Sequence, residues 1–210
     1  MTTPTSRRER KKAATRRAIA DTARRLFLER GYDAVGIRDI AAEADVAVTT
    51  LFAHFPCKEA LVFAQDEDFE QQLTRTVTDR APHEPLIPAL RRQIELLVRH
   101  CAAAPVWQMI GETPALRDYE ASVRLRHAES LAAAIAADPD LERSATACRA
   151  TARFVIDAYS LAREAADPQA TLDEIFHMIE AAWAVTGPAR EPQATATSGT
   201  AQNSRAATTR

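Results

Sequence analysis

The residue types that could carry catalytic or metal chemistry are scattered along the chain. Histidines stand at positions 54, 83, 100, 127 and 177, and cysteines at 57, 101 and 148. The sequence contains no Cys-x-x-Cys pair, no His-Glu-x-x-His helix, no Gly-x-Ser-x-Gly elbow and no phosphate-binding glycine loop. His100 beside Cys101, joined by His127 or Cys148, could hold zinc in principle, but the spacing gives no support. We therefore expect no metal, no cofactor and no enzymatic activity.

A different chemistry, recognition of a nucleic acid, is indicated by residues 47–54, which read Ala-Val-Thr-Thr-Leu-Phe-Ala-His. This stretch predicts a short helix over 48–54. Thr49, Thr50 and Ala53 make one side of that helix small, so it could approach base edges in a major groove about 12 Å wide. Leu51 and Phe55 are expected to face inward and to pin the helix to its support.

The spacing of apolar residues predicts the elements that must position this helix. A helix is expected over 11–30, ended by Gly31. Four residues with helical period predict its buried side: Ile19, Ala23, Leu26 and Phe27. A second helix over 37–44 leads through a tight turn into the helix at 48–54. Two short helices joined by such a turn, behind a longer one, form the helix-turn-helix pattern.

The rest of the chain predicts further helices, so we expect an all-α fold of about nine helices. Five glycines in 210 residues are too few for the turns of a β-sandwich. A long helix is expected over 58–80, ended by the segment Ala-Pro-His-Glu-Pro. Apolar spacing and Pro, Asp or Thr caps predict the others: 86–103, 105–112, 114–137, 140–166 and 171–186.

Charge and cysteine usage restrict the partners and the compartment. Residues 1–58 carry twelve Lys and Arg against seven Asp and Glu, whereas the remaining residues carry fifteen against twenty-two. A basic first third favours a polyanionic partner. The sequence contains no run of eighteen apolar residues, so no membrane span is predicted. No apolar signal segment follows the basic N-terminus. With three widely spaced cysteines, this predicts a cytoplasmic protein with reduced thiols.

The run RRAIADTARRLFLERGYDAVGIRDIAAEADVAVTTLFAHFPCKEAL, residues 16–61, resembles the DNA-binding domain of the TetR family of transcriptional regulators. The shared features are the Leu-Phe and Gly-Tyr-Asp end of the first helix, the IRDIA second helix, and the Thr-Leu-Phe-x-His-Phe and Lys-Glu-x-Leu run after it. The resemblance implies a ligand-responsive transcriptional regulator, most often a repressor, released from its operator by a small, largely apolar effector. The alternatives are an activator or ligand-independent DNA binder and, from another class, a helical metal or redox protein.

Composition and the resemblance together predict a division into domains, and the resemblance implies roles for single residues. We expect a disordered basic arm over 1–10, a helix-turn-helix DNA-binding domain over 11–57, a ligand-binding and dimerisation domain over 58–186, and a disordered tail over 187–210. Thr49 and Thr50 would approach bases or phosphates in the major groove, and His54 and Lys58 would bind phosphates. Arg38 and the basic residues 7–17 would add attraction that is independent of sequence.

Three positions depart from the pattern of the family. Gly36 stands where a capping Thr is common, Ala47 replaces the usual Ser cap, and Cys57 replaces a Ser or Asn. Loss of a cap side chain to Ala typically costs about 1 kcal/mol. Cys57 could sense oxidants at a helix N-terminus, or could simply substitute for the cap. Phe52 replaces a common Tyr, so one hydroxyl contact to phosphate is missing.

The resemblance further implies an effector pocket and a homodimer. Apolar candidates for the pocket are Leu97, Trp107, Met109, Ile110, Phe154 and Tyr159. Polar candidates are His100, Arg117, Arg124, His127 and Asp157. The helices at 140–166 and 171–186 are apolar on more than one side, so each could also pack on a second copy; burial within one subunit is the alternative. The expected partners are thus a pseudo-palindromic DNA operator, an effector and a second copy, but no membrane.

Overall fold

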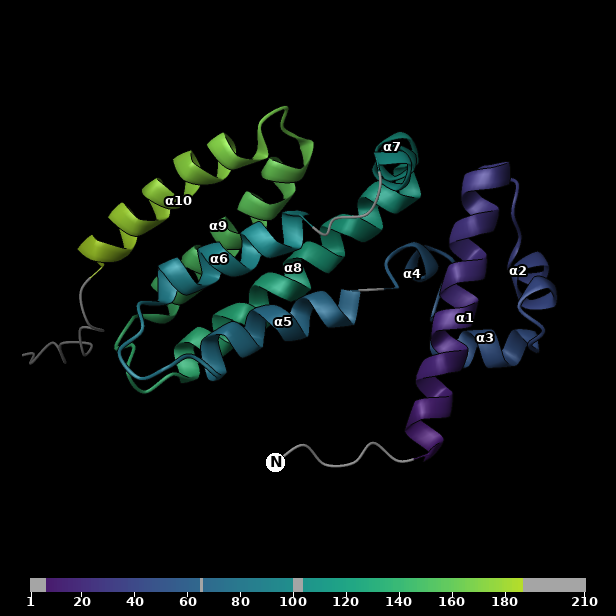
Figure 1. Ribbon diagram of the computed structural model, residues 1–210, viewed down its shortest axis with the longest axis horizontal. Coiled ribbons are helices and arrows are strands. Elements are labelled where there is room, and N and C mark those ends of the chain that lie inside the picture. The colour runs from purple at the N-terminus through teal and green to yellow at the C-terminus, as the bar shows by residue number, and fades with distance from the viewer. Residues whose placement is uncertain (1–6, 65, 100–103, 187–210) are drawn as a thin grey trace, which may run out of the picture.

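The computed structural model describes residues 7–64, 66–99 and 104–186, and all regular elements in these ranges are helices (Figure 1). This confirms the predicted all-α fold, with ten helices in the described ranges against about nine expected. Their bounds are α1 Arg7–Arg30, α2 Ile37–Glu43, α3 Val48–His54, α4 Glu59–Val62, α5 Asp66–Thr78, α6 Leu86–Arg99, α7 Ala104–Glu112, α8 Pro114–Ala137, α9 Ala145–Glu164 and α10 Pro168–Val185.

Helix α1 begins before its predicted start. Residues 7–10, which we expected in a disordered arm, form its first turn. Arg, Glu and Lys are good helix formers, and Glu9 lies in the first turn, where a negative charge is favourable. Residues 1–6 and the predicted tail over 187–210 lie outside the described residues.

The prediction of a single long helix over 58–80 is wrong. Helix α4 ends after Val62, and α5 starts at Asp66. Phe63 leaves the helical conformation, with φ −99° and ψ 33°, and the centroid of its ring lies 5.3 Å from that of Tyr119 on α8. Helical residues stand on both sides of this break, so local periodicity could not reveal it. A tertiary contact accompanies the break.

Two other predicted boundaries move because of caps. Helix α9 starts at Ala145 and not at 140, since the Ser144 hydroxyl accepts a hydrogen bond of 3.1 Å from the Ala147 N–H. Helix α10 starts at Pro168, before the predicted 171, because the Asp167 carboxylate accepts a 3.0 Å bond from the Ala170 N–H. Helix α6 ends at Arg99, and the remainder of its predicted range lies outside the described residues.

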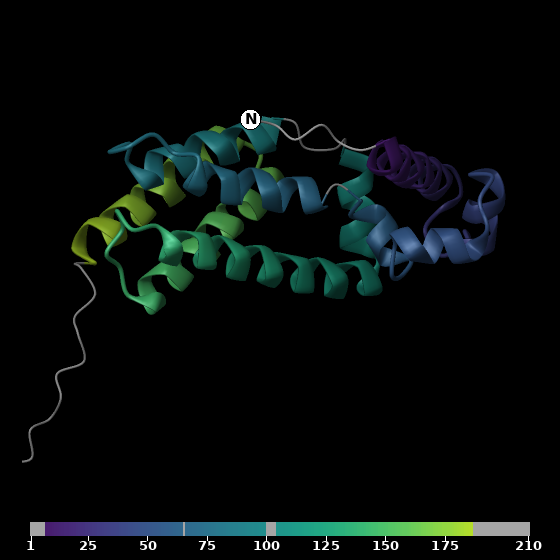
Figure 2. The same cartoon turned by 90° about the horizontal axis from the view of Figure 1, so that it is seen from below.

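The helices form two apolar cores, which we call the N-terminal and C-terminal clusters. The N-terminal cluster is built on α1–α4 and also contains Val106 and Ile110 from α7 and Leu116 from the start of α8. The C-terminal cluster joins α5, α6, α9, α10 and the second half of α8. Figures 1 and 2 show α1–α4 at one end of the molecule and α5, α6, α9 and α10 at the other, with α8 reaching from one group to the other. The boundary between the two apolar cores therefore falls inside α8, and the division into domains at residues 57 and 58 stays a prediction.

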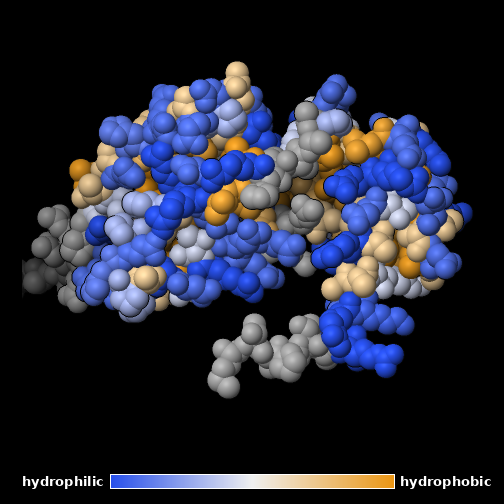
Figure 3. Space-filling view, in the orientation of Figure 1, coloured by the Kyte–Doolittle hydropathy of each residue, from blue (hydrophilic) through white to orange (hydrophobic). Residues whose placement is uncertain are grey.

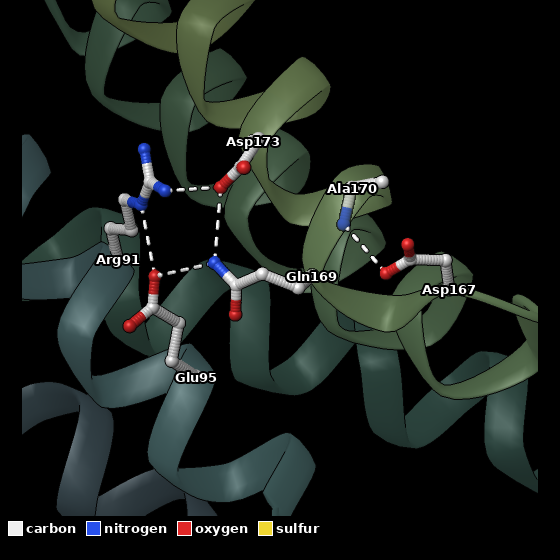
Figure 4. A network of polar contacts seen from close by, with 6 residues as sticks. All are labelled: Arg91, Glu95, Asp167, Gln169, Ala170 and Asp173. Carbon is white, nitrogen blue, oxygen red and sulfur yellow. Dashed lines mark hydrogen bonds and ion pairs between the residues drawn. The ribbon is translucent and has the colours of Figure 1, made fainter.

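A polar network holds α10 against α6 (Figure 4). Arg91 donates a 3.0 Å hydrogen bond to Glu95 on its own helix and forms an ion pair with Asp173 of α10. Gln169 donates to both carboxylates, at 3.4 Å to Glu95 and 3.0 Å to Asp173. Among the described helices, none has the length and apolar character needed to cross a bilayer.

Candidate nucleic-acid interface

A tight turn between α2 and α3 sets the direction of the short helix predicted to recognise DNA. Asp45 takes the left-handed conformation, with φ 52°, which Asp tolerates better than most residues. The Val46 N–H donates a 2.9 Å bond to the carbonyl oxygen of Ala41 and closes the turn. At the start of α2, the Asp39 carboxylate accepts a 2.8 Å bond from the Gly36 N–H, so half of a capping box is present. Ala47 supplies no side-chain cap to α3.

Helix α3 presents the side that the sequence predicted. Leu51 and Phe55 are fully buried in the N-terminal cluster. Thr49 is exposed, Thr50 is half-buried, and the neighbouring Phe52 is 48% exposed. An exposed phenyl ring beside small hydroxyl side chains can contact thymine methyl groups and sugars, although it cannot donate to a phosphate. The geometry thus leaves one face of α3 available to a partner.

Basic side chains are exposed on α1 and α2, the two helices that pack against α3. Residues 7–14 of α1 are exposed, and Figure 3 shows the projecting end of α1 as hydrophilic surface. Arg16 of α1 donates a hydrogen bond to the carbonyl oxygen of His54, and its guanidinium lies 4.3 Å from the centroid of the Phe55 ring. Arg38 on α2 is exposed as well. Cations on neighbouring helices are the groups that a phosphate backbone attracts, so contact of α1 and Arg38 with phosphates stays a prediction.

Sequence reasoning missed the contact between Arg16 and α3. The two partners are 38 residues apart in the chain, so no local pattern could pair them. The contact satisfies a carbonyl group that the end of a helix leaves without an intrahelical partner. It also fixes the basic helix beside α3.

His54 is half-buried at the end of α3. Its Nδ1 atom is buried and has no hydrogen-bond partner among the described residues. Burial, followed by the positive charges of Lys12 and Arg16, lowers the pKa of His54 from its ordinary value. In the free protein the imidazole is therefore held toward its neutral form, and an approaching phosphate would favour its protonation.

Lys58 points into the domain. Its Nζ atom donates a 2.6 Å hydrogen bond to the carbonyl oxygen of Tyr32 and lies 4.0 Å from the centroid of the Tyr32 ring. Burial lowers the pKa of Lys58. Tyr32 in turn donates a 3.0 Å bond from its hydroxyl to Glu59. Lys58 thus links the loop after α1 to α4, and phosphate binding by its ammonium stays a prediction.

The Cys57 thiol, half-buried beside this cluster, has a raised pKa because of burial. A raised pKa reduces the thiolate fraction that reacts with oxidants. The raised pKa therefore favours the interpretation that Cys57 substitutes for a helix cap over the interpretation that it senses oxidants. Cys148 is buried in the C-terminal cluster, and burial raises its pKa too.

The candidate pocket residues fall into separate places. Met109 and Ile110 pack in the N-terminal cluster, whereas Leu97 packs in the C-terminal one. Phe69 of α5 brings two candidates together, because its ring lies 4.9 Å from His127 and 4.7 Å from Tyr159. Figures 1 and 2 show that α5 and α8, which carry Phe69 and His127, run beside each other.

The other candidates lie apart from this group. Trp107 is half-buried on α7, and Arg117 is exposed and donates to the carbonyl oxygen of Gly111 at 2.6 Å. Arg124 and Asp157 form an ion pair between α8 and α9. Phe154 is 54% exposed, so it does not line an internal pocket with the rest.

The remaining pocket candidate, His100, lies outside the described residues, as does Cys101 of the zinc alternative. Two surface hollows, of about 480 and 470 Å³, open near the loop between α5 and α6 and are lined by none of the candidates. Within the described ranges, no three His, Cys, Asp or Glu side chains gather as a metal site would require.

The fold and the exposed α3 define a helix-turn-helix protein with a helical C-terminal body. Residues 19–64 match the family described as bacterial regulatory proteins, tetR family. The HTH-type transcriptional repressor Rv3405c of Mycobacterium tuberculosis is 36% identical over 120 residues, which cover 57% of this chain and 64% of that protein. The chain thus matches just under two thirds of that relative's length.

Solved structures share the fold. The TetR family repressor AlkX from Dietzia sp. has a TM-score of 0.57 at 21% identity, over 81% of this chain and 98% of that one. The SmeT–triclosan complex has a TM-score of 0.54 at 22% identity, over 85% and 98%. The match to the tetR family thus covers residues 19–64, and the solved structures share the helical fold of the chain.

Proposed function

We propose that this protein is a transcriptional regulator that binds a pseudo-palindromic DNA operator as a homodimer. The observation that carries the proposal is the placement of α3. Its buried Leu51 and Phe55 hold it in the N-terminal cluster, while Thr49 is exposed, as are Arg38 and the basic start of α1 on the neighbouring helices. A short outward helix flanked by cations suits a major groove whose phosphate rims are negative.

An exposed apolar face on α9 and α10 supports the dimer. Phe154 and Leu161, seven residues apart on α9, are 54% and 53% exposed, and Met178 on α10 is 57% exposed. Residues seven apart lie on the same side of a helix. A second copy packed on this face would cover them and would give two recognition helices for two half-sites. The predicted dimer helices, 140–166 and 171–186, contain these residues.

We propose repression, relieved by a small and largely apolar effector, as the mode of action. The relative in Mycobacterium tuberculosis is named a repressor, and SmeT has been solved with triclosan. The aromatic group of Phe69, His127 and Tyr159 lies among α5, α8 and α9 and offers the apolar surroundings such a molecule needs. The protein would act in the cytoplasm, on DNA.

Selection from a random pool of DNA duplexes tests the proposal. The full chain is expected to enrich an inverted repeat at low salt, whereas Thr49→Ala/Thr50→Ala is expected to enrich no sequence or a relaxed one. Failure of the wild-type chain to enrich any sequence would contradict DNA recognition. Deletion of the gene should raise transcription from promoters that carry the repeat; a fall would instead indicate an activator.

The effector is tested separately. A panel of small apolar compounds is screened by thermal shift, and each compound that binds is added to the complex with the selected DNA. A compound of this kind is expected to weaken DNA binding, with coupling of about 1–3 kcal/mol. If every compound that binds leaves the DNA affinity unchanged, the protein is a ligand-independent binder with respect to this class.

A further inference from the structure

Arg163 of α9 is buried at the junction of the two apolar clusters. Its side chain is 7% exposed, and it donates a 2.9 Å hydrogen bond to Glu120 of α8, whose side chain is 16% exposed. The guanidinium carbon lies 3.6 Å from the centroid of the Trp107 ring on α7 and 5.9 Å from that of Tyr159. Nε of Arg163 is buried and has no hydrogen-bond partner among the described residues.

These contacts connect helices that belong to different cores. Trp107 packs against the N-terminal cluster, together with Val106 and Ile110 of the same helix. Arg163 follows Ala162, which is fully buried in the C-terminal cluster. The guanidinium thus joins α9 to the part of the molecule that carries α3.

Helix α9, which carries Arg163, also carries the exposed apolar residues of the proposed dimer face, Phe154 and Leu161. Movement of α7 relative to α9 would therefore change the position of α3 relative to the second subunit. Arg163 lies at the contact between α7, α8 and α9, where such a movement would occur.

We propose that Arg163 is a positioning residue for DNA recognition, which sets the distance between the two recognition helices by holding Trp107 and Glu120 against the dimer-forming helix. The inference rests on the proposed function. A planar guanidinium can stack on an indole and pair with a carboxylate at once, whereas a Lys ammonium lacks the plane. Arg163 also donates a 3.1 Å hydrogen bond to the exposed Glu164. Glu120 is mostly buried, so separating it from Arg163 would leave a carboxylate without this partner in the interior, which is costly.

A small change in the angle between these helices would shift the recognition helix by a distance that matters for the spacing of half-sites. Helix α8 has 24 residues and is therefore about 36 Å long. A tilt of about 5° over that length moves its far end by about 3 Å, close to the rise of one base pair. Loss of the Arg163 contacts should therefore weaken the preference of the protein for one spacing of half-sites.

The test uses duplexes that carry the selected half-sites at the preferred spacing, or with one base pair added or removed. Wild-type protein is expected to lose about tenfold in affinity for either altered spacing, within the usual range of coupling between sites. For Arg163→Met we expect weaker binding at the preferred spacing and affinities within about threefold across the three duplexes. Affinity for a duplex with a single half-site should stay as in the wild type.

Two further variants separate positioning from folding. Glu120→Gln keeps the shape of the partner but removes its charge, and Arg163→Lys keeps the charge but removes the planar stack; both should lie between wild type and Arg163→Met. Arg153→Met is the matched control, because Arg153 lies on the exposed side of α9, 3.6 Å from Glu129. The control is expected to retain wild-type discrimination between spacings.

Helicity and sedimentation show whether each variant is a folded dimer. A folded dimeric Arg163→Met with wild-type discrimination would overturn the inference, as would a wild-type protein that binds all three spacings equally. If Arg163→Met does not fold, Glu120→Gln decides by the same criterion. If wild-type protein binds no selected DNA, the proposed function itself fails, and this outcome is distinct from the others.

Discussion

A side-chain N–H of Arg16 donates a hydrogen bond to the carbonyl oxygen of His54, the last residue of α3. The bond joins the basic helix α1 to the end of the proposed recognition helix. Because Arg16 also stacks on the buried Phe55, the junction is held by an apolar and a polar contact together. The charge of α1 is thereby placed beside the surface that would face the DNA.

The exposed start of α1 should control the salt dependence of binding. Replacing Arg7, Arg8, Lys11 and Lys12 by Gln is expected to weaken binding to all sequences alike. The slope of log K against log salt should become shallower by about 0.9 for each phosphate that the variant no longer neutralises. Titrations at several salt concentrations measure this slope. Arg149→Gln/Arg153→Gln on α9 serves as the control, and an unchanged slope in the α1 variant would refute a DNA contact by this helix.

Thr49 and Thr50 should carry sequence preference. Either residue changed to Ala is expected to reduce discrimination between the selected operator and a scrambled duplex by about 1–3 kcal/mol if its hydroxyl contacts a base edge. Competition binding measures the difference. Thr76→Ala on α5 controls for loss of a hydroxyl elsewhere. Equal reductions in affinity for both duplexes would assign the threonines to the backbone.

Lys58 should affect stability before it affects DNA binding. Lys58→Met would remove the hydrogen bond to the Tyr32 carbonyl and the positive charge over the Tyr32 ring. We expect the free energy of unfolding to fall by about 1 kcal/mol, as for a typical partly exposed hydrogen bond. Urea denaturation gives this value. A variant with unchanged stability but a flatter salt slope would instead support direct phosphate binding.

His54 should make both stability and binding depend on pH. Its pKa in the folded protein is held below the ordinary 6.5, chiefly by burial. The folded chain then binds fewer protons at this residue than the unfolded chain just below pH 6.5, so the contribution to stability is present above that pH and is lost as the pH falls toward the folded pKa.

A phosphate beside His54 would raise its pKa, so DNA binding should take up a proton. Affinity is then expected to increase as the pH falls from about 7.5 to about 6. His54→Gln should remove this increment, whereas His177→Gln on α10 should keep it. Binding titrations in buffers of different ionisation enthalpy count the protons. If His54→Gln keeps the full pH dependence, His54 does not meet a phosphate.

The exposed face of α9 and α10 should hold two copies together. Leu161→Glu or Met178→Glu would place a charge in the proposed interface and is expected to yield monomers that lose affinity for the two half-site operator. Sedimentation measures the oligomeric state. Leu125→Glu on α8, where Leu125 is 52% exposed, is the matched control. Dimers that persist in both α9 and α10 variants would exclude this face as the interface.

Local patterns predicted most helices and the presentation of α3. Leu51 and Phe55 are buried as their spacing indicated, and Thr49 is exposed, because a turn of α-helix separates faces by residue number alone. The same periodicity could not detect the break after Val62, where Phe63 contacts Tyr119 far along the chain. Residue type indicates pocket candidates but not their packing, and those within the described residues are spread over both cores and the surface.

By itself, the sequence determined the all-helical fold, the helix-turn-helix and the resemblance of residues 16–61 to the TetR family, because these depend on residue types at short and regular spacings. Only the tertiary structure decided where the two cores divide, which side chains Arg16, Lys58 and Arg163 contact, and which faces of α9 and α10 remain uncovered. Those features depend on contacts between residues distant in the chain. Helical periodicity indicates that a face is apolar, but the packing of the whole chain decides what covers it.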